Sequence, residues 1–246
     1  MTEHKNQSLS NNRDNFIEKK ICLLSYPRSG SNWLRYMTEV VYKKPTQAPN
    51  FKASINSEGM NGPLVKLLNN SQIKLNKSYS PMIHIHDVAH RQEAQDIIFI
   101  IRNYKEFGAS FEGIQMDRYV RILKSFDQFR PLNWFSVSKK LLIRYEDLID
   151  EEKIKSIFVK LNNFFESEDD QHENEIKDFI KNLEEHKKNS IDIYEKHNIK
   201  TLTKGKGALF HSKQMSKVDR KEIDEKVKRK SPALFEKYLK IYEESD

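Results

Sequence analysis

The segment that most constrains the fold is 20–42, where a short apolar run leads into a turn and then into a helical pattern. Residues 20–25 (KICLLS) have the apolar character of a buried strand, and 26–31 (YPRSGS) have the composition of a turn. From 32 to 42, apolar side chains recur near helical spacing. A strand, a glycine-containing turn and a helix in this order form the opening of an α/β nucleotide-binding unit.

Further apolar runs predict three more strands, at 81–87, 96–101 and 140–145. The run at 96–101 is apolar on both faces, as in a central strand of a parallel sheet. Helical patterns follow these strands, at 107–114, 119–129, 151–166, 173–197 and 219–243, the last interrupted at Pro232. Strands that alternate with helices predict the α/β class, with a central parallel sheet flanked by helices.

The length of 246 residues suits one α/β domain, and the composition changes at two places along it. Residues 1–18 are polar, which predicts a disordered or frayed N-terminus. Residues 19–246 form the predicted single domain. Within it, 43–80 is rich in Pro, Gly, Asn and Ser, so we expect a loop-rich insertion there.

Three features of the sequence bear on where the protein works. No apolar run approaches the roughly 18 residues that a membrane-spanning helix needs. The N-terminal stretch lacks the apolar core of a secretory signal, and the lone Cys22 fits a reducing compartment. We therefore expect a cytoplasmic protein with no membrane span.

The charge balance indicates a negatively charged partner. The chain has 43 Lys and Arg residues against 36 Asp and Glu residues, a net charge of +7. Nucleic acid, a membrane surface and a phosphorylated ligand all fit such a surplus. No aromatic RNA-binding strand or helix-turn-helix pattern stands out, so we expect no nucleic-acid partner.

The turn at 25–33 is the most informative stretch of the sequence. A turn that joins the carboxyl end of a strand to a helix presents free backbone N–H groups and the positive end of the helix dipole, which attract an anion. Gly30 lets the backbone approach a ligand, Arg28 adds a permanent charge, and Trp33 offers a flat surface for a base. Further donors come from the side chains of Ser29, Ser31 and Asn32. The Walker pattern G-x-x-x-x-G-K-[ST] is absent.

Residues 26–33 (YPRSGSNW) resemble the 5′-phosphosulfate loop of sulfotransferases that use 3′-phosphoadenosine 5′-phosphosulfate (PAPS), in its bacterial form. Arg102 ends a predicted strand and Ser110 lies eight residues further on, which is similar to the family's 3′-phosphate site. The YEDL sequence at 145–148 resembles a family strand end whose Tyr, here Tyr145, lies near the adenine. The family's late R-K-G-x-x-G loop has a counterpart in which Thr replaces the Arg, and its cofactor-binding positions are Lys204, Gly205 and Lys206.

This resemblance implies a P-loop-like sulfotransferase fold and the transfer of a sulfuryl group from PAPS, leaving adenosine 3′,5′-bisphosphate (PAP). It implies no metal. Arg28 is expected both to bind the donor and to act in catalysis, by stabilising the charge that develops on the leaving group. The expected acceptor is a hydroxyl or an amine of a small molecule or a glycan, and the insertion at 43–80 is expected on the acceptor side of the site. The prediction leaves room for a homodimer.

Two histidines in the predicted strand at 81–87 bear on catalysis. His86 takes the position of the family's catalytic His, and an imidazole with a pKa near ~6.5 suits a general base for the acceptor. His84 takes the position of a family Lys that helps to hold the transferring group. A neutral imidazole carries no fixed charge, so whether His84 replaces that Lys is an open question.

Two other functions stay open at this point. Residues two apart in a strand share a face, so His84 and His86 could bind one metal ion, as in a His-x-His metal hydrolase. Because the family Lys is missing at position 84, the chain could also be a catalytically weak nucleotide-binding module. Formation of PAP from PAPS with candidate acceptors would separate an active enzyme from a binding module.

Overall fold

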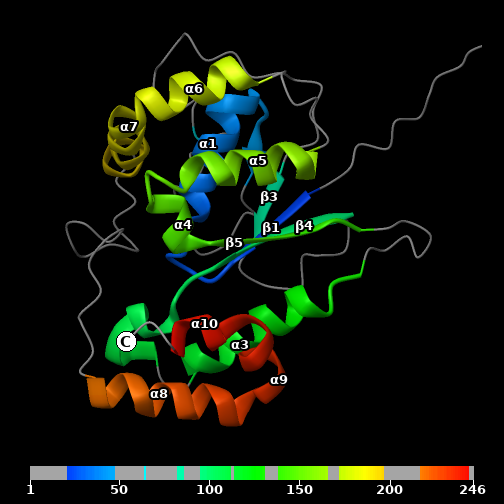
Figure 1. Ribbon diagram of the computed structural model, residues 1–246, viewed down its shortest axis with the longest axis vertical. Coiled ribbons are helices and arrows are strands. Elements are labelled where there is room, and N and C mark those ends of the chain that lie inside the picture. The colour runs from blue at the N-terminus through cyan, green and yellow to red at the C-terminus, as the bar shows by residue number, and fades with distance from the viewer. Residues whose placement is uncertain are drawn as a thin grey trace, which may run out of the picture.

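The structure is a computed structural model, and it describes residues 21–47, 64, 82–85, 95–111, 114–130, 138–165, 172–196 and 217–243. These residues form an α/β architecture in which helices cover both faces of a parallel sheet (Figure 1). This confirms the predicted α/β class with a parallel sheet flanked by helices. The predicted N-terminal segment 1–18 and most of the predicted insertion 43–80 lie outside the described residues.

The sheet of the described residues has the strand order β2-β3-β1-β4-β5, and every pair is parallel. The strands are β1 (Ile21–Ser25), β2 (Thr46–Gln47), β3 (Met82–Ile85), β4 (Asp96–Ile101) and β5 (Lys140–Arg144). Four of them match the predicted strands. β2 was not predicted, because two residues are too few to show any periodicity.

The register of the strands brings three chain segments together at the carboxyl edge of the sheet. Ser25 at the end of β1 pairs with Ile100 of β4, and Ile101 pairs with Arg144 of β5. The turn after β1, residue 102 and the end of β5 are therefore neighbours, although they are far apart in the sequence. In open parallel sheets this edge is where ligands bind.

The first face of the sheet, drawn above it in Figure 1, packs against the helices that follow β1 and β5. They are α1 (Ser31–Tyr42), α4 (Tyr145–Ile149), α5 (Ile154–Phe165), α6 (Glu173–Lys181) and α7 (Leu183–Lys196). The predicted helix at 173–197 is thus two helices. Asn182 ends α6: its φ of −106° departs from the helical value, and its side-chain Nδ2 donates to the Asp178 carbonyl oxygen at 3.0 Å.

The second face packs against a 3₁₀ helix and the C-terminal helices. These are η3 (Tyr104–Phe111), α3 (Ile114–Asp127), α8 (Lys217–Lys230), α9 (Pro232–Leu234), the π-helical turn η4 (Phe235–Leu239) and α10 (Lys240–Glu243). The predicted interruption at Pro232 is confirmed, since α8 ends at Lys230. Within the described ranges, no helix is both long and apolar enough to cross a bilayer.

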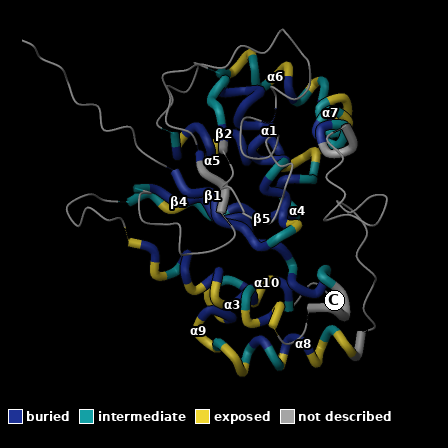
Figure 2. The backbone as a smooth tube through the Cα atoms, turned by 180° about the vertical axis from the view of Figure 1, so that it is seen from behind, coloured by how far each residue is buried: buried dark blue, intermediate teal, exposed yellow. Residues whose placement is uncertain are grey.

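The side chains of β4 divide the core into two clusters. Ile98 and Ile100 pack on the first face, whereas Ile97, Phe99 and Ile101 pack on the second. This alternation follows from the period of two in a strand, and it explains why the 96–101 run is apolar throughout. Figure 2 shows β1 and β4 buried at the centre, with the exposed positions on the outer sides of the helices.

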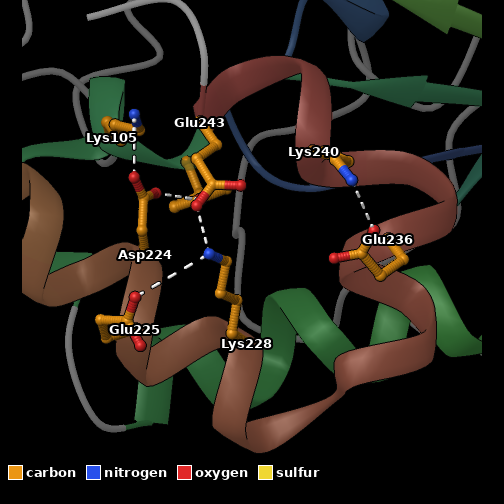
Figure 3. Close-up of polar contacts among 8 residues, drawn as sticks. Lys105, Asp224, Glu225, Lys228, Glu236, Lys240 and Glu243 are labelled. Atoms are coloured by element: carbon orange, nitrogen blue, oxygen red, sulfur yellow. Dashed lines mark hydrogen bonds and ion pairs between the residues drawn. The ribbon is translucent and has the colours of Figure 1, made fainter.

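A buried ion pair ties α8 to the segment that follows β4. Lys105 Nζ lies 3.1 Å from Asp224 Oδ2, and their side chains are 0% and 7% exposed. Figure 3 shows the two side chains pointing toward each other from η3 and α8. Asp224 also accepts a hydrogen bond from the hydroxyl of Tyr104. The C-terminal helices are therefore fixed to the part of the chain that carries the predicted Arg102.

Candidate functional site

The turn between β1 and α1 has an unusual backbone. Arg28 and Gly30 both have left-handed conformations, with φ of 67° and 82°. A Cβ atom on Gly30 would lie only 2.8 Å from Cδ2 of Tyr145, so both the conformation and the close packing require glycine here. The left-handed conformation of Arg28 is unfavourable for a residue with a side chain, and such strain is often found where a chain binds ligands.

The first turn of α1 leaves its backbone donors available to a ligand. Among the residues that the structure describes, no side-chain hydrogen bond caps this end of the helix, and its first turn contains no acidic residue. Ser31 and Asn32 begin the helix, and the first hydrogen bond along it runs from the Leu34 N–H to the Gly30 carbonyl oxygen at 3.0 Å. N–H groups at the start of a helix and the helix dipole both favour an anion.

Two buried donors next to this turn have no hydrogen-bond partner among the described residues. They are the hydroxyl of Ser29, a residue that is 0% exposed, and Nε of Arg102, a residue that is 7% exposed. Buried polar groups in proteins almost always have partners, because an unsatisfied one is costly. A negatively charged group held at the turn would supply the missing acceptors.

Arg102 is fixed against the turn rather than extended into solvent. Its Nη1 donates to the carbonyl oxygen of Arg28 at 2.7 Å. The guanidinium lies over the Tyr145 ring at 4.4 Å and near the Phe107 ring at 5.5 Å. The planar cation is thus oriented by two rings and one carbonyl.

The two arginines expected at the donor differ in exposure. Arg28 is exposed, whereas Arg102 is buried. The structure therefore combines a fixed inner charge with an outer charge at the same turn. Ser110, the expected partner of Arg102, lies in η3, and its side chain is outside the described residues.

Trp33 has a different environment from the one expected, and its predicted role as a surface for a base is corrected here. Its Nε1 donates to the Leu148 carbonyl oxygen at 3.0 Å, and its ring stacks on Tyr36 with centroids 5.7 Å apart. Only 7% of the residue is exposed. Trp33 lies on the inner side of α1, so its side chain belongs to the core, and only its backbone N–H is part of the helix start.

Tyr145 is the first residue of α4, one position beyond the end of β5, so the predicted strand at 140–145 was one residue too long. Its buried ring packs against Gly30 on the turn and supports the guanidinium of Arg102. Burial raises the pKa of the Tyr145 phenol, and the nearby Arg102 charge partly opposes this shift. Tyr145 is therefore part of the site, with its ring in contact with protein groups.

Two residues at the site were not predicted to act there. The Tyr119 hydroxyl donates to the Arg102 carbonyl oxygen at 2.8 Å, and Glu146 Oε1 accepts from the Asn103 N–H at 2.8 Å. Tyr119 gave no signal in the sequence beyond an apolar helix position. Glu146 stands inside the YEDL motif, but its contact depends on the packing of β5 against β4.

Several predicted site residues lie outside the described part of the chain. They are His86 and the late-loop residues Lys204, Gly205 and Lys206, and the side chain of His84 is also not described. The general base, the closing loop and the rival metal site therefore stay predictions. Within the described residues, no three His, Cys, Asp or Glu side chains are grouped as a metal site requires.

A surface hollow of about 590 Å³ lies elsewhere, between the turn that joins α4 to α5 and the junction of α6 and α7. Its lining contains Glu151, Glu152, Glu184 and Glu185, and none of its residues belongs to the β1–α1 turn. Its negative charge is unsuited to an anionic ligand. The chemistry of the turn, and not the size of the hollow, identifies the candidate site.

No family model matches this chain, and no curated protein sequence matches it.

Proposed function

We propose that this protein is a PAPS-dependent sulfotransferase that binds the 5′-phosphosulfate of its donor at the β1–α1 turn. The observation that carries the proposal is the pair of buried, unpartnered donors, Ser29 Oγ and Arg102 Nε, next to an uncapped helix start. A phosphosulfate is a group of oxygen acceptors with negative charge and would satisfy Ser29 Oγ and the helix start, while the 3′-phosphate of the same nucleotide would satisfy Arg102 Nε.

The arrangement of the sheet supports the proposal further. The turn follows β1, which is flanked by β3 and β4 in the parallel sheet, so its donors lie at the carboxyl edge. Arg102 follows β4 at the same edge and can meet a second phosphate of the same nucleotide. A P-loop-like sulfotransferase fold is the finer description that we propose for this architecture.

The proposed reaction is a direct displacement at sulfur. An acceptor oxygen or nitrogen forms a bond to sulfur while the bond from sulfur to the bridging phosphate oxygen breaks, and PAP is released. His86 takes the proton from the acceptor, and Arg28 stabilises the charge that grows on the bridging oxygen. We propose a small molecule or a glycan as the acceptor, because that is the acceptor class implied by the sequence resemblance.

Nucleotide titration and an acceptor screen test this function. The intact chain is titrated with PAP and with adenosine 5′-monophosphate (AMP), which lacks the 3′-phosphate, and then incubated with labelled PAPS and a panel of acceptors. We expect tighter binding of PAP than of AMP, and formation of PAP with at least one acceptor. In Arg102→Ala, the affinity for PAP should fall much more than that for AMP. Equal affinity of the intact chain for the two nucleotides would contradict the proposal.

A further inference from the structure

The peptide group that joins Arg102 to Asn103 is held at both ends by side chains from other elements. Its carbonyl oxygen accepts a hydrogen bond from the Tyr119 hydroxyl of α3 at 2.8 Å. Its N–H donates to Oε1 of Glu146 in α4, also at 2.8 Å. One peptide plane is thus fixed by two side chains that come from opposite faces of the sheet.

The two side chains that hold this peptide are themselves fixed. Glu146 Oε2 accepts a hydrogen bond from the Tyr242 hydroxyl of α10 at 3.1 Å, and the carboxylate lies 3.9 Å from Arg144 Nε. The Tyr119 ring packs edge-on against Tyr26, with centroids 5.5 Å apart, and the residue is only 1% exposed. Neither side chain can turn away without the loss of these contacts.

The position of this peptide in the chain links it to the orientation of the Arg102 side chain. β4 ends at Ile101, so the ladder hydrogen bonds of the sheet no longer fix the backbone at Arg102. The segment beyond this peptide is held by the Lys105–Asp224 pair, so a rotation of the peptide must be taken up at the Arg102 backbone. The guanidinium would then shift away from the Arg28 carbonyl oxygen and the Tyr145 ring. The orientation of the cation therefore depends on the peptide as well as on its own contacts.

We infer that Tyr119 and Glu146 are positioning residues that hold Arg102 ready for the 3′-phosphate of the nucleotide. This inference rests on the proposed function, because that function gives Arg102 its ligand. Neither residue touches the ligand. They act through one backbone peptide and keep the guanidinium in place before the nucleotide arrives.

The experiment compares the affinity of the intact chain and its variants for PAP and for AMP by calorimetric titration. Tyr119→Phe removes one oxygen and keeps the ring, and Glu146→Ala removes the acceptor. Glu146→Gln keeps an oxygen for the Asn103 N–H and is the rescue variant. The matched controls are Tyr238→Phe, which loses a hydrogen bond to Asp127, and Glu236→Ala, which loses an exposed pair with Lys240. Circular dichroism confirms that each variant is folded.

The inference predicts a selective loss. Tyr119→Phe and Glu146→Ala should each weaken PAP binding about tenfold, the usual scale of one hydrogen bond, and should change AMP binding much less. Glu146→Gln and both controls should bind like the intact chain. The double variant Tyr119→Phe/Glu146→Ala should lose about as much as either single variant, because both free the same peptide.

The failures of the two proposals give different results. If the intact chain does not prefer PAP to AMP, the proposed function is wrong and this inference falls with it. If the intact chain prefers PAP and both Tyr119→Phe and Glu146→Ala keep that preference, only the inference is wrong. A loss of affinity that is equal for the two nucleotides would also overturn it, because it would indicate a general structural role. Tyr119→Phe alone decides the matter if Glu146→Ala does not fold.

Discussion

Arg102 Nη1 donates a hydrogen bond to the carbonyl oxygen of Arg28 at 2.7 Å, and this contact joins the segment after β4 to the turn after β1. The two residues are 74 positions apart, and the parallel register of the strands brings them together. The contact uses one donor of the guanidinium and leaves the buried Nε without a partner among the described residues. The same arginine therefore braces the turn and keeps a donor for a ligand.

Substitution of Gly30 by Ala should destabilise the protein strongly. The residue has a φ of 82°, which costs about 1–2 kcal/mol for a residue with a Cβ, and that Cβ would lie 2.8 Å from the Tyr145 ring. Together these effects should lower the free energy of unfolding by at least about 2 kcal/mol. Urea denaturation measures this change. A loss of less than about 0.5 kcal/mol would show that the turn does not have the described conformation.

Substitution of Arg28 by Gly should change stability and binding in opposite directions. The φ of 67° is unfavourable for Arg and easy for Gly, so the free energy of unfolding should rise by up to about 1 kcal/mol. The affinity for PAP should fall about tenfold or more, because a charged donor is lost. Urea denaturation and calorimetric titration measure the two effects. An unchanged affinity for PAP would contradict a ligand-binding role for Arg28, and a fall in the free energy of unfolding would contradict the strain argued from its φ angle.

Substitution of Asp224 by Asn should lower the stability of the folded protein. Lys105 and Asp224 form a buried pair at 3.1 Å, so the variant removes the negative charge of Asp224 from a buried ammonium group. Loss of one partner of such a pair costs about 3–5 kcal/mol. Thermal denaturation should therefore show a clearly lower melting temperature.

The control for this prediction is Glu236→Gln, which removes the exposed pair between Glu236 and Lys240 drawn in the same view (Figure 3). Exposed pairs contribute less than about 1 kcal/mol, so the control should melt almost like the parent. If Asp224→Asn and Glu236→Gln lowered the melting temperature equally, the Lys105–Asp224 pair would not be what fixes the C-terminal helices. The double variant Lys105→Met/Asp224→Leu should recover much of the lost stability.

The stability of the protein should fall as the pH drops from 7 to 5, in part through His186. Its ring stacks on Phe179 with centroids 4.2 Å apart, and Nδ1 lies 3.0 Å from the Tyr36 hydroxyl. Burial lowers the pKa of His186, an effect that the charges of Glu185 and Asp178 oppose and that of Lys43 supports. The folded state thus binds the proton less readily than the unfolded state.

The sign of the effect follows from this pKa shift. Above the unfolded pKa near ~6.5 the neutral imidazole contributes its full stability, and this is lost as the pH falls through the lowered folded pKa. In His186→Phe, the change in unfolding free energy between pH 7 and pH 5 should be smaller than in the parent. If the unfolding free energy changed by the same amount between pH 7 and pH 5 in both proteins, His186 would be excluded as a source of the pH dependence. His172, whose pKa burial also lowers, is unchanged in the comparison.

The strands and the turn were readable from the sequence because each depends on a local pattern. The apolar run of β4 and the strand–turn–helix order around Gly30 need only neighbouring residues. Trp33 was misread for the same reason: the motif shows that an aromatic ring follows the turn, but not which side of α1 it occupies. Its burial depends on Leu148 and Tyr36, and on how α4 packs against α1.

The supports of Arg102 could not be predicted, because they come from three separate parts of the chain. Tyr119 lies in α3, Glu146 in α4 and Tyr242 in α10, and only the folded sheet brings them together. The sequence named Arg102 through its place at a strand end. The carbonyl, ring and hydroxyl that hold Arg102 are set by tertiary packing.

The crystal structure of the intact chain with PAP tests the central claim most directly. The account predicts the 5′-phosphate at the β1–α1 turn, with oxygen atoms about 3 Å from Ser29 Oγ and from the N–H groups at the start of α1. It also predicts that Arg102 Nε, now without a partner among the described residues, contacts the nucleotide. A nucleotide bound elsewhere, with Ser29 Oγ and Arg102 Nε still unpartnered, would contradict the account.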